Sequence, residues 1–250
     1  EISACLVGSE MCIRDRLIYA PKAMEKRLPS VGPLLEKHYD LAKKALQFNP
    51  KEEPVAGKVA VYLFDQRDHF TAFVRRVEKR RVQASDASNF VAIGDAPHVV
   101  TGPSRDKQGL GVEAQAGEQL AGLLLAFKAG VRTPVPDWVV AGFGRATHYR
   151  AAPRDPAVAA DRRQAAKLAR VRSARDVWGG TVESAEAGAL QGSLVDFLAY
   201  GPGAKRFPKF VEGFKPEDNA NKTTAQALDA AGLTADRVEK AWKSWAVRPH

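Results

Sequence analysis

The sequence predicts an α+β protein, in which a small N-terminal sheet with flanking helices is followed by a mainly helical C-terminal half. Short runs rich in β-branched and aromatic residues lie between residues 58 and 101, whereas from residue 112 onward the apolar residues recur at helical spacing. The chain has 250 residues, enough for one large domain or two modest ones, each with its own core.

The elements of the N-terminal half follow from local patterns. Residues 31–48 carry apolar side chains at three- and four-residue steps, which predicts a helix that Asn49 and Pro50 end. Residues 58–64 are short and β-branched, which favours a strand. Asp65 then caps a helix over residues 66–80, whose apolar stripe is Phe70, Phe73, Val74 and Val77.

Two further strands are predicted over residues 89–94 and 98–101, joined by a tight turn at residues 95–97. They could form a hairpin or lie as successive strands of one sheet. A polar, glycine-containing loop over residues 102–111 leads into residues 112–129, the longest strongly apolar helix candidate, which Gly130 closes. We expect this helix to be central in the fold.

The C-terminal half is predicted to be helical. An alanine- and arginine-rich helix over residues 155–171 has the composition of a linker or inserted helix. The other predicted helices span residues 183–200, 204–214 and 223–231, with a last helix from Thr234 that carries Trp242 and Trp245. The longest apolar run, residues 120–131, is interrupted by Gly122 and Lys128 and is shorter than the roughly 20 residues of a bilayer span. No transmembrane segment is expected.

Residues 1–16 are expected to be non-native. Residues 6–15 read as the translation of a transposon-type sequencing adapter, so we exclude residues 1–16 from the fold and expect the native start to be missing. The only two cysteines, Cys5 and Cys12, lie in this segment. The remainder therefore offers no disulfide framework and no thiolate zinc site, and cysteine usage does not indicate a redox compartment.

The protein is basic, with 38 lysines and arginines against 29 acidic residues and a net charge of +9. The excess persists when residues 1–16 are excluded. Such a charge favours acidic partners such as nucleic acid, anionic lipid or cell-wall polymers, but it says nothing about the fold. No specific nucleic-acid partner is expected, because the basic clusters are scattered and no aromatic platform or groove-reading motif accompanies them.

The most informative stretches are residues 116–121 (AGEQLA) and residues 136–142 (PDWVVAG). Their order, an apolar helix followed by Pro-Asp-Trp opening another helix, resembles the peptidase MA-like metallopeptidases of the gluzincin group. That family carries His-Glu-x-x-His on the first helix and a glutamate on the second, which together hold one zinc ion and its activated water. The downstream order of Tyr200-Gly201-Pro202 and a final helix containing Trp242 and Trp245 is also similar to the family, so the resemblance covers residues 38–247.

The resemblance implies a zincin-like fold from which the zinc ligands have been lost. It puts Gly117 and Ala121 at the two histidine positions, Glu118 at the water-activating position and Ala141 at the third-ligand position, with Trp138 and Gly142 in their expected places. One carboxylate cannot replace three protein ligands, and without metal it cannot make water a competent nucleophile for amide cleavage. No catalytic, cofactor-binding or metal-ligating residue is therefore assigned, and no cofactor is expected.

A purely structural interpretation of the same residues stays open. Gly117, Ala121 and Gly122 could simply permit close helix packing, and Trp138 could be a core aromatic. Against this stands Glu118, because an unpaired carboxylate in an apolar helix is costly to bury. Arg145 or His148 is expected to be its partner.

The sequence thus predicts three regions: the adapter-like segment 1–16, a zincin-like α+β region over residues 17–150 with a vestigial site, and a helical region over residues 151–250. The favoured function is that of a pseudo-metallopeptidase that binds a peptide or protein in its cleft or at its sheet edge. Two alternatives are an active zinc peptidase with other ligands, such as Glu118, His148 and a residue of another chain, and a basic module for anionic polymers. The resemblance also hints at export or association with the cell envelope. The oligomeric state does not follow from the sequence.

Overall fold

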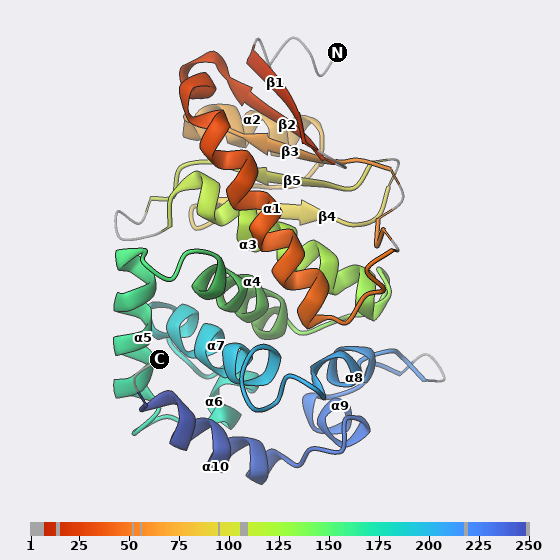
Figure 1. Ribbon diagram of the computed structural model, residues 1–250, viewed down its shortest axis with the longest axis vertical. Helices are drawn as coiled ribbons and strands as arrows, with labels where there is room; N and C mark the ends of the chain where they lie inside the picture. Colours follow the sequence, from red (N-terminus) through yellow and green to blue (C-terminus); the bar gives the residue numbers. More distant parts are fainter. Residues whose placement is uncertain are drawn as a thin grey trace.

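The computed structural model describes residues 8–13, 16–51, 53–55, 57–94, 96–105, 110–217 and 220–248. Of the adapter-like segment, residues 1–7, which include Cys5, and residues 14 and 15 lie outside the described residues, as does the terminal His250. The remaining chain is α+β, with a five-stranded mixed sheet at the N-terminal end and a mostly helical C-terminal half, as expected (Figure 1).

The sheet has the strand order β1-β2-β3-β5-β4. The inner strands β2, β3 and β5 are parallel, and the outer strands β1 and β4 run antiparallel to their neighbours. The strands are β1 (Gly8–Ile13), β2 (Arg16–Pro21), β3 (Val59–Leu63), β4 (Ser88–Val91) and β5 (His98–Thr101). Strands β4 and β5 form the hairpin that their sequence allowed.

The sheet begins earlier than the sequence indicated, because β1 and β2 were not predicted. Part of the segment interpreted as adapter-derived, Gly8–Ile13, pairs with β2 along the sheet edge. Arg16, which was also included in that segment, is almost fully buried, and its guanidinium lies 4.3 Å from the centre of the Tyr39 ring. A six-residue 3-10 helix, Lys22–Arg27, then leads into the first α-helix.

Alternation along the strands separates the two faces of the sheet. Val61 and Leu63 join the main core, whereas Phe64 on the other face packs with Phe70 and Phe73 of α2 (Arg67–Arg76) in a smaller cluster. Helix α2 is shorter than predicted, and Phe70, Phe73 and Val74 are buried as expected. The main face is covered by α1 (Leu28–Ala45) and by α3 (Val112–Ala129) (Figure 1). The bounds of α3 match the prediction, whereas α1 begins and ends three residues earlier than predicted.

The helices that follow α3 build the lower part of Figure 1 around α4 and α7. Helix α6 was not predicted, because its five residues are too short for a periodic pattern. It spans Ala174–Trp178. The others match predicted helices within a few residues: α4 (Asp137–Ala151), α5 (Pro156–Leu168), α7 (Ser184–Ala199), α8 (Phe207–Glu212), α9 (Thr224–Ala230) and α10 (Ala235–Ala246). One hydrophobic core runs from Ile18 of the sheet to Ala246 of the last helix, so the sheet and the helical half share it.

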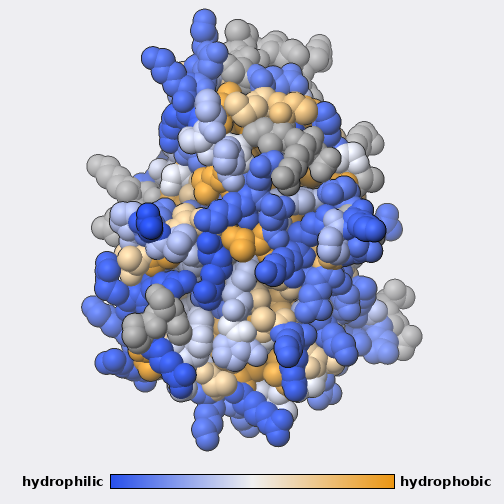
Figure 2. Space-filling view, viewed as in Figure 1, coloured by the Kyte–Doolittle hydropathy of each residue, from blue (hydrophilic) through white to orange (hydrophobic). Residues whose placement is uncertain are grey.

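Most side chains on the face seen in Figure 2 are hydrophilic, with small apolar areas between them. Within the described part of the chain, none of the helices has the length and apolar character needed to cross a bilayer.

Helix α4 packs against α3 on one side and against α7 on the other, and glycines set both contacts. A Cβ atom at Gly144 would lie 2.7 Å from the carbonyl oxygen of Glu118, and one at Gly142 would lie 2.6 Å from that of Gln191. Backbone atoms cannot move aside as the end of a flexible side chain can. Helix α4 therefore lies so close to both neighbours that only hydrogen fits at these two positions.

We expect Gly142→Ala to lower the free energy of unfolding by about 1–3 kcal/mol, because the added methyl group forces α4 and α7 apart. Urea unfolding followed by circular dichroism measures this. The matched control is Ala141→Gln on the same helix, where the side chain is exposed and a change within about 0.5 kcal/mol is expected. Equal stability of Gly142→Ala and the wild type would show that the contact is looser than described.

Candidate functional site

The candidate site lies where α3 and α4 cross, with α1 beside them. Gly117, Glu118 and Ala121 come from α3, and Trp138, Ala141 and Gly142 come from α4. Gly117 and Ala121 are buried, whereas Ala141 is exposed. Trp138 is a core residue, and the centre of its ring lies 6.3 Å from the centre of the Trp178 ring and 6.2 Å from that of the Phe210 ring. Gly142 faces α7. The structure therefore places these six residues in different environments.

Gly117 is glycine because the imidazole of His38 fills the space beside it. A Cβ atom at position 117 would lie 2.6 Å from three atoms of the His38 ring, which comes from α1 and is fully buried. The position that corresponds to a histidine ligand in the resembling family thus faces a histidine of another helix. Sequence reasoning did not find this contact, because nothing in the linear pattern relates His38 to Gly117.

His38 is the first member of a buried chain of hydrogen-bonding groups. Its Nδ1 lies 2.8 Å from the carbonyl oxygen of Leu34, and its Nε2 lies 3.1 Å from Nδ1 of His148 on α4. The Nε2 of His148 lies 3.2 Å from a carboxylate oxygen of Asp155, which also caps α5 by accepting from the Ala157 N–H. The two rings are stacked with centroids 5.3 Å apart.

Burial lowers the pKa of His38 to about 4 and lowers the pKa of His148 below its ordinary value. Both rings are therefore neutral at pH 7 and carry one N–H each. The oxygens of Leu34 and Asp155 can only accept, so they take these two N–H groups. The contact between the two rings becomes a hydrogen bond only when a third proton enters the chain.

Glu118 has the partner that the sequence suggested. The Nε of Arg145 lies 3.4 Å from Oε1 of Glu118 and 3.3 Å from a carboxylate oxygen of Asp161, which also accepts a hydrogen bond from Tyr149. The prediction that Arg145 or His148 pairs with Glu118 is confirmed for Arg145. One guanidinium thus serves two carboxylates.

Burial raises the pKa of Glu118 to about 7; Arg145 opposes this shift, and the charge of Asp161 adds to it. Its Oε1 is buried and makes no hydrogen bond. Near neutral pH the group is therefore partly protonated, which limits the cost of an imperfectly paired buried charge.

The donors present do not fit a catalytic zinc ion. Such a site needs three protein ligands and an open position, but Gly117, Ala121 and Ala141 have no donor atoms. The remaining carboxylate, Glu118, lies against the positively charged Arg145. Within the residues that the structure describes, no group of three histidine, cysteine or acidic side chains is arranged to hold a metal ion.

Comparison with known proteins adds no assignment for this chain. No protein-family model matches it, and no curated protein does.

The shifted pKa of Glu118 predicts how stability depends on pH. The folded state holds this proton up to about pH 7, whereas the unfolded chain releases it near the ordinary pKa of 4.5. Between these values the folded state binds more protons, so the contribution of Glu118 to stability falls as the pH rises and is fully unfavourable above pH 7. The lowered pKa of His38 acts in the opposite direction, since stability is lost as the pH falls from 6.5 toward 4.

The variant Glu118→Gln separates these two effects, because glutamine keeps the shape and does not titrate. Relative to Glu118→Gln, the wild type should lose on the order of 3 kcal/mol of unfolding free energy between pH 5 and pH 8. Urea unfolding at several pH values measures the difference. A difference that does not change with pH would contradict the raised pKa.

Proposed function

We propose that this protein is a peptidase-like protein that binds an extended peptide without cleaving it, and that the peptide adds to the outer edge of β4. The proposal depends on one observation, the unpaired edge of β4 beside the α3 helix. In the described part of the chain, β5 is the only strand that pairs with β4.

The register of β4 identifies the backbone groups that point outward. The N–H of Gly102 donates to the carbonyl oxygen of Ala87, and the carbonyl oxygen of Thr101 accepts from Phe64 at the start of the loop after β3. The backbone N–H and C=O of Thr101 therefore point toward β3. Because Ser88 and Thr101 are opposite each other in the antiparallel pair and do not bond to one another, the backbone N–H and C=O of Ser88 point away from β5. Phe90, two residues further, does the same. Among the described residues no backbone hydrogen bond to these outward groups is found, so an added strand can pair with them.

The side chains hold this edge next to the candidate site. The amide of Gln119 on α3 donates to the Ser88 hydroxyl at 2.9 Å, and the Phe90 ring packs over Gly122. Gln119 is adjacent to Glu118, so a peptide on β4 would pass beside Glu118, which aligns with the water-activating glutamate of the family that the sequence resembles. The chain would retain a peptidase-like binding edge where the donors for a zinc-bound water are missing.

The first test concerns the chemistry. After zinc loading and desalting, the full chain should contain less than about one tenth of an equivalent of zinc and should not digest a generic protein substrate. Elemental analysis and a casein digestion assay measure this. Near one equivalent of zinc, with cleavage that a chelator stops, would instead support an active metallopeptidase with other ligands.

The second test concerns binding. Peptides selected from a random phage-displayed library should bind at least about tenfold more weakly to Ser88→Pro than to the wild type, since proline removes the outward N–H. The control Ser88→Ala keeps the outward N–H and loses only the hydroxyl that accepts from Gln119, so its binding should fall far less than that of Ser88→Pro. Equal binding to Ser88→Pro and Ser88→Ala, or a selection without binders, would refute binding at the β4 edge.

A further inference from the structure

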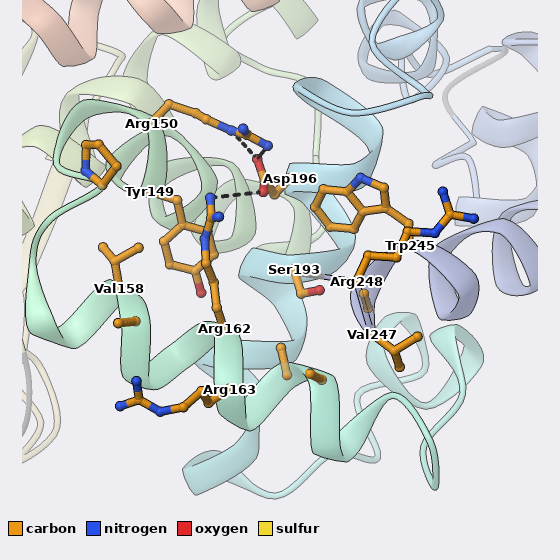
Figure 3. A pocket seen from close by; sticks show the side chains of 15 residues that line it. Tyr149, Arg150, Val158, Arg162, Arg163, Ser193, Asp196, Trp245, Val247 and Arg248 are labelled. Carbon is orange, nitrogen blue, oxygen red and sulfur yellow. Dashed lines mark hydrogen bonds and ion pairs between the residues drawn. The ribbon is translucent and has the colours of Figure 1, made fainter. Parts of the chain in front are cut away.

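A second feature of the helical half is a pocket of about 730 Å³ between the C-terminal end of α4, helices α5 and α7, and the end of α10 (Figure 3). Its volume lies in the range of roughly 300–1,000 Å³ that small-molecule sites occupy. Of the candidate site's groups, the pocket contains only Tyr149, whose hydroxyl donates to Asp161.

One wall of the pocket is a charged cluster in which two arginines share one carboxylate. Arg150 donates from Nε to Asp196 at 2.7 Å, and Nη2 of Arg162 lies 3.7 Å from the other oxygen of Asp196. Asp196 is almost fully buried, and both arginines are partly exposed to the pocket. Figure 3 shows the two guanidinium groups converging on this carboxylate. The cluster carries a net charge of one positive unit.

The rim adds more positive charge. Arg163 of α5 and Arg248 after α10 are exposed and stand on opposite sides of the pocket in Figure 3. Within the described chain, no ion pair of either residue is found; Arg248 donates to the neutral Ser244 hydroxyl. Among the described residues, the lining thus contains four arginines and a single carboxylate. Its field attracts an anion and repels a cation.

The rest of the lining is mostly apolar. Val158, Ala166 and Val247 contribute aliphatic surface, and Trp245 contributes a large aromatic side chain. The hydroxyl of Ser193 lies near the middle of the pocket in Figure 3 and accepts a hydrogen bond from Trp242, which leaves its O–H to donate. An apolar ligand body and an acidic group would therefore both find complementary surface.

We propose that this pocket binds a small organic anion in which a phosphate or carboxylate group is attached to an aromatic or aliphatic body. Guanidinium groups recognise both kinds of acid with charge-assisted hydrogen bonds, and Arg150 has donors beyond those that Asp196 uses. The body of the ligand lies against Trp245 and the aliphatic side chains. A polymeric anion is disfavoured because a pocket of this volume holds a compact group better than a continuous backbone. The inference does not depend on peptide binding at β4.

The experiment titrates the full chain with 1-naphthyl phosphate by isothermal calorimetry. Inorganic phosphate and 1-naphthol serve as partial probes, each of which lacks one half of the ligand. Stoichiometric binding of 1-naphthyl phosphate, at least about tenfold tighter than either partial probe, is expected. 1-Naphthoate, measured in parallel, decides whether phosphate or carboxylate is preferred. Equal binding of inorganic phosphate and 1-naphthyl phosphate would overturn the role of the apolar walls.

Two variants test the location. Arg163→Gln with Arg248→Gln removes both rim charges and should weaken binding about tenfold, while leaving the Asp196 cluster intact. The control, Lys167→Gln with Lys240→Gln, removes two exposed charges from α5 and α10 outside the lining and should leave the affinity unchanged. Equal losses in the two double variants would show attraction by net charge alone and would overturn the pocket.

Ala166→Phe fills the pocket without removing a charge and should abolish binding of 1-naphthyl phosphate. Its circular dichroism and melting temperature establish that it folds. If it folds and still binds with wild-type affinity, the site lies elsewhere. Binding of a single-stranded oligonucleotide that outcompetes 1-naphthyl phosphate and is insensitive to Ala166→Phe would likewise overturn the proposal in favour of a polymer-binding surface.

Discussion

The close packing of α4 between α3 and α7 is the constraint on which both sites depend. Gly144 lies against the backbone of Glu118, and Gly142 lies against the backbone of Gln191. With only hydrogen atoms at these contacts, the side chains that follow on α4 have fixed positions. Arg145 reaches Glu118 and Asp161, while His148 meets His38 and Tyr149 reaches Asp161. One backbone geometry thus sets the polar interactions of the candidate site.

In both polar clusters around α4, one charged side chain is shared by two groups of opposite charge. Arg145 pairs with two carboxylates, and Asp196 pairs with two arginines. Burial raises the pKa of Glu118 to about 7, and Arg145, which Glu118 shares with Asp161, opposes this shift only in part. The Asp196 cluster leaves the pocket with excess positive charge. Tyr149 lies between the two clusters, since its ring lines the pocket and its hydroxyl binds Asp161. Helix α4 therefore contributes side chains to both sites: Arg145 pairs with Glu118, and Arg150 lines the pocket.

The sheet and the helical half would serve the proposed function in different ways. The sheet ends at β4, whose outward backbone groups at Ser88 and Phe90 lie next to α3. The helical half supplies Arg145, whose guanidinium pairs with Glu118 of α3 and with Asp161. The origin of residues 1–16 from an adapter stays a prediction, although Gly8–Ile13 of this segment pairs with β2. That pairing is confined to the edge opposite β4, so the candidate site does not depend on it.

The sequence by itself determined the fold class and most of the elements, because hydrophobic periodicity is a local property. Helix α3, strands β4 and β5 and the apolar face of α2 follow from spacing, whereas the antiparallel pairing of β4 with β5 was left open by the sequence and is given by the fold. Strands β1 and β2 were not predicted, because they lie in or next to residues 1–16, which were excluded from the fold. The short helix α6 was not predicted, because five residues are too few to show a helical period. The sequence also shows that Gly117, Ala121 and Ala141, which align with the zinc ligands of the family that it resembles, have no side chain that can bind a metal ion.

Only the tertiary structure decided what surrounds those positions. His38 fills the space at Gly117 from 79 positions earlier in the chain, and the pocket arginines come from α4, α5 and the end of α10. No local pattern relates residues so far apart, because the contact arises from helix packing and not from spacing. The choice of Arg145 over His148 as the partner of Glu118 has the same origin: the two lie close together on α4, and the crossing with α3 brings the guanidinium to Glu118 while His148 turns toward His38.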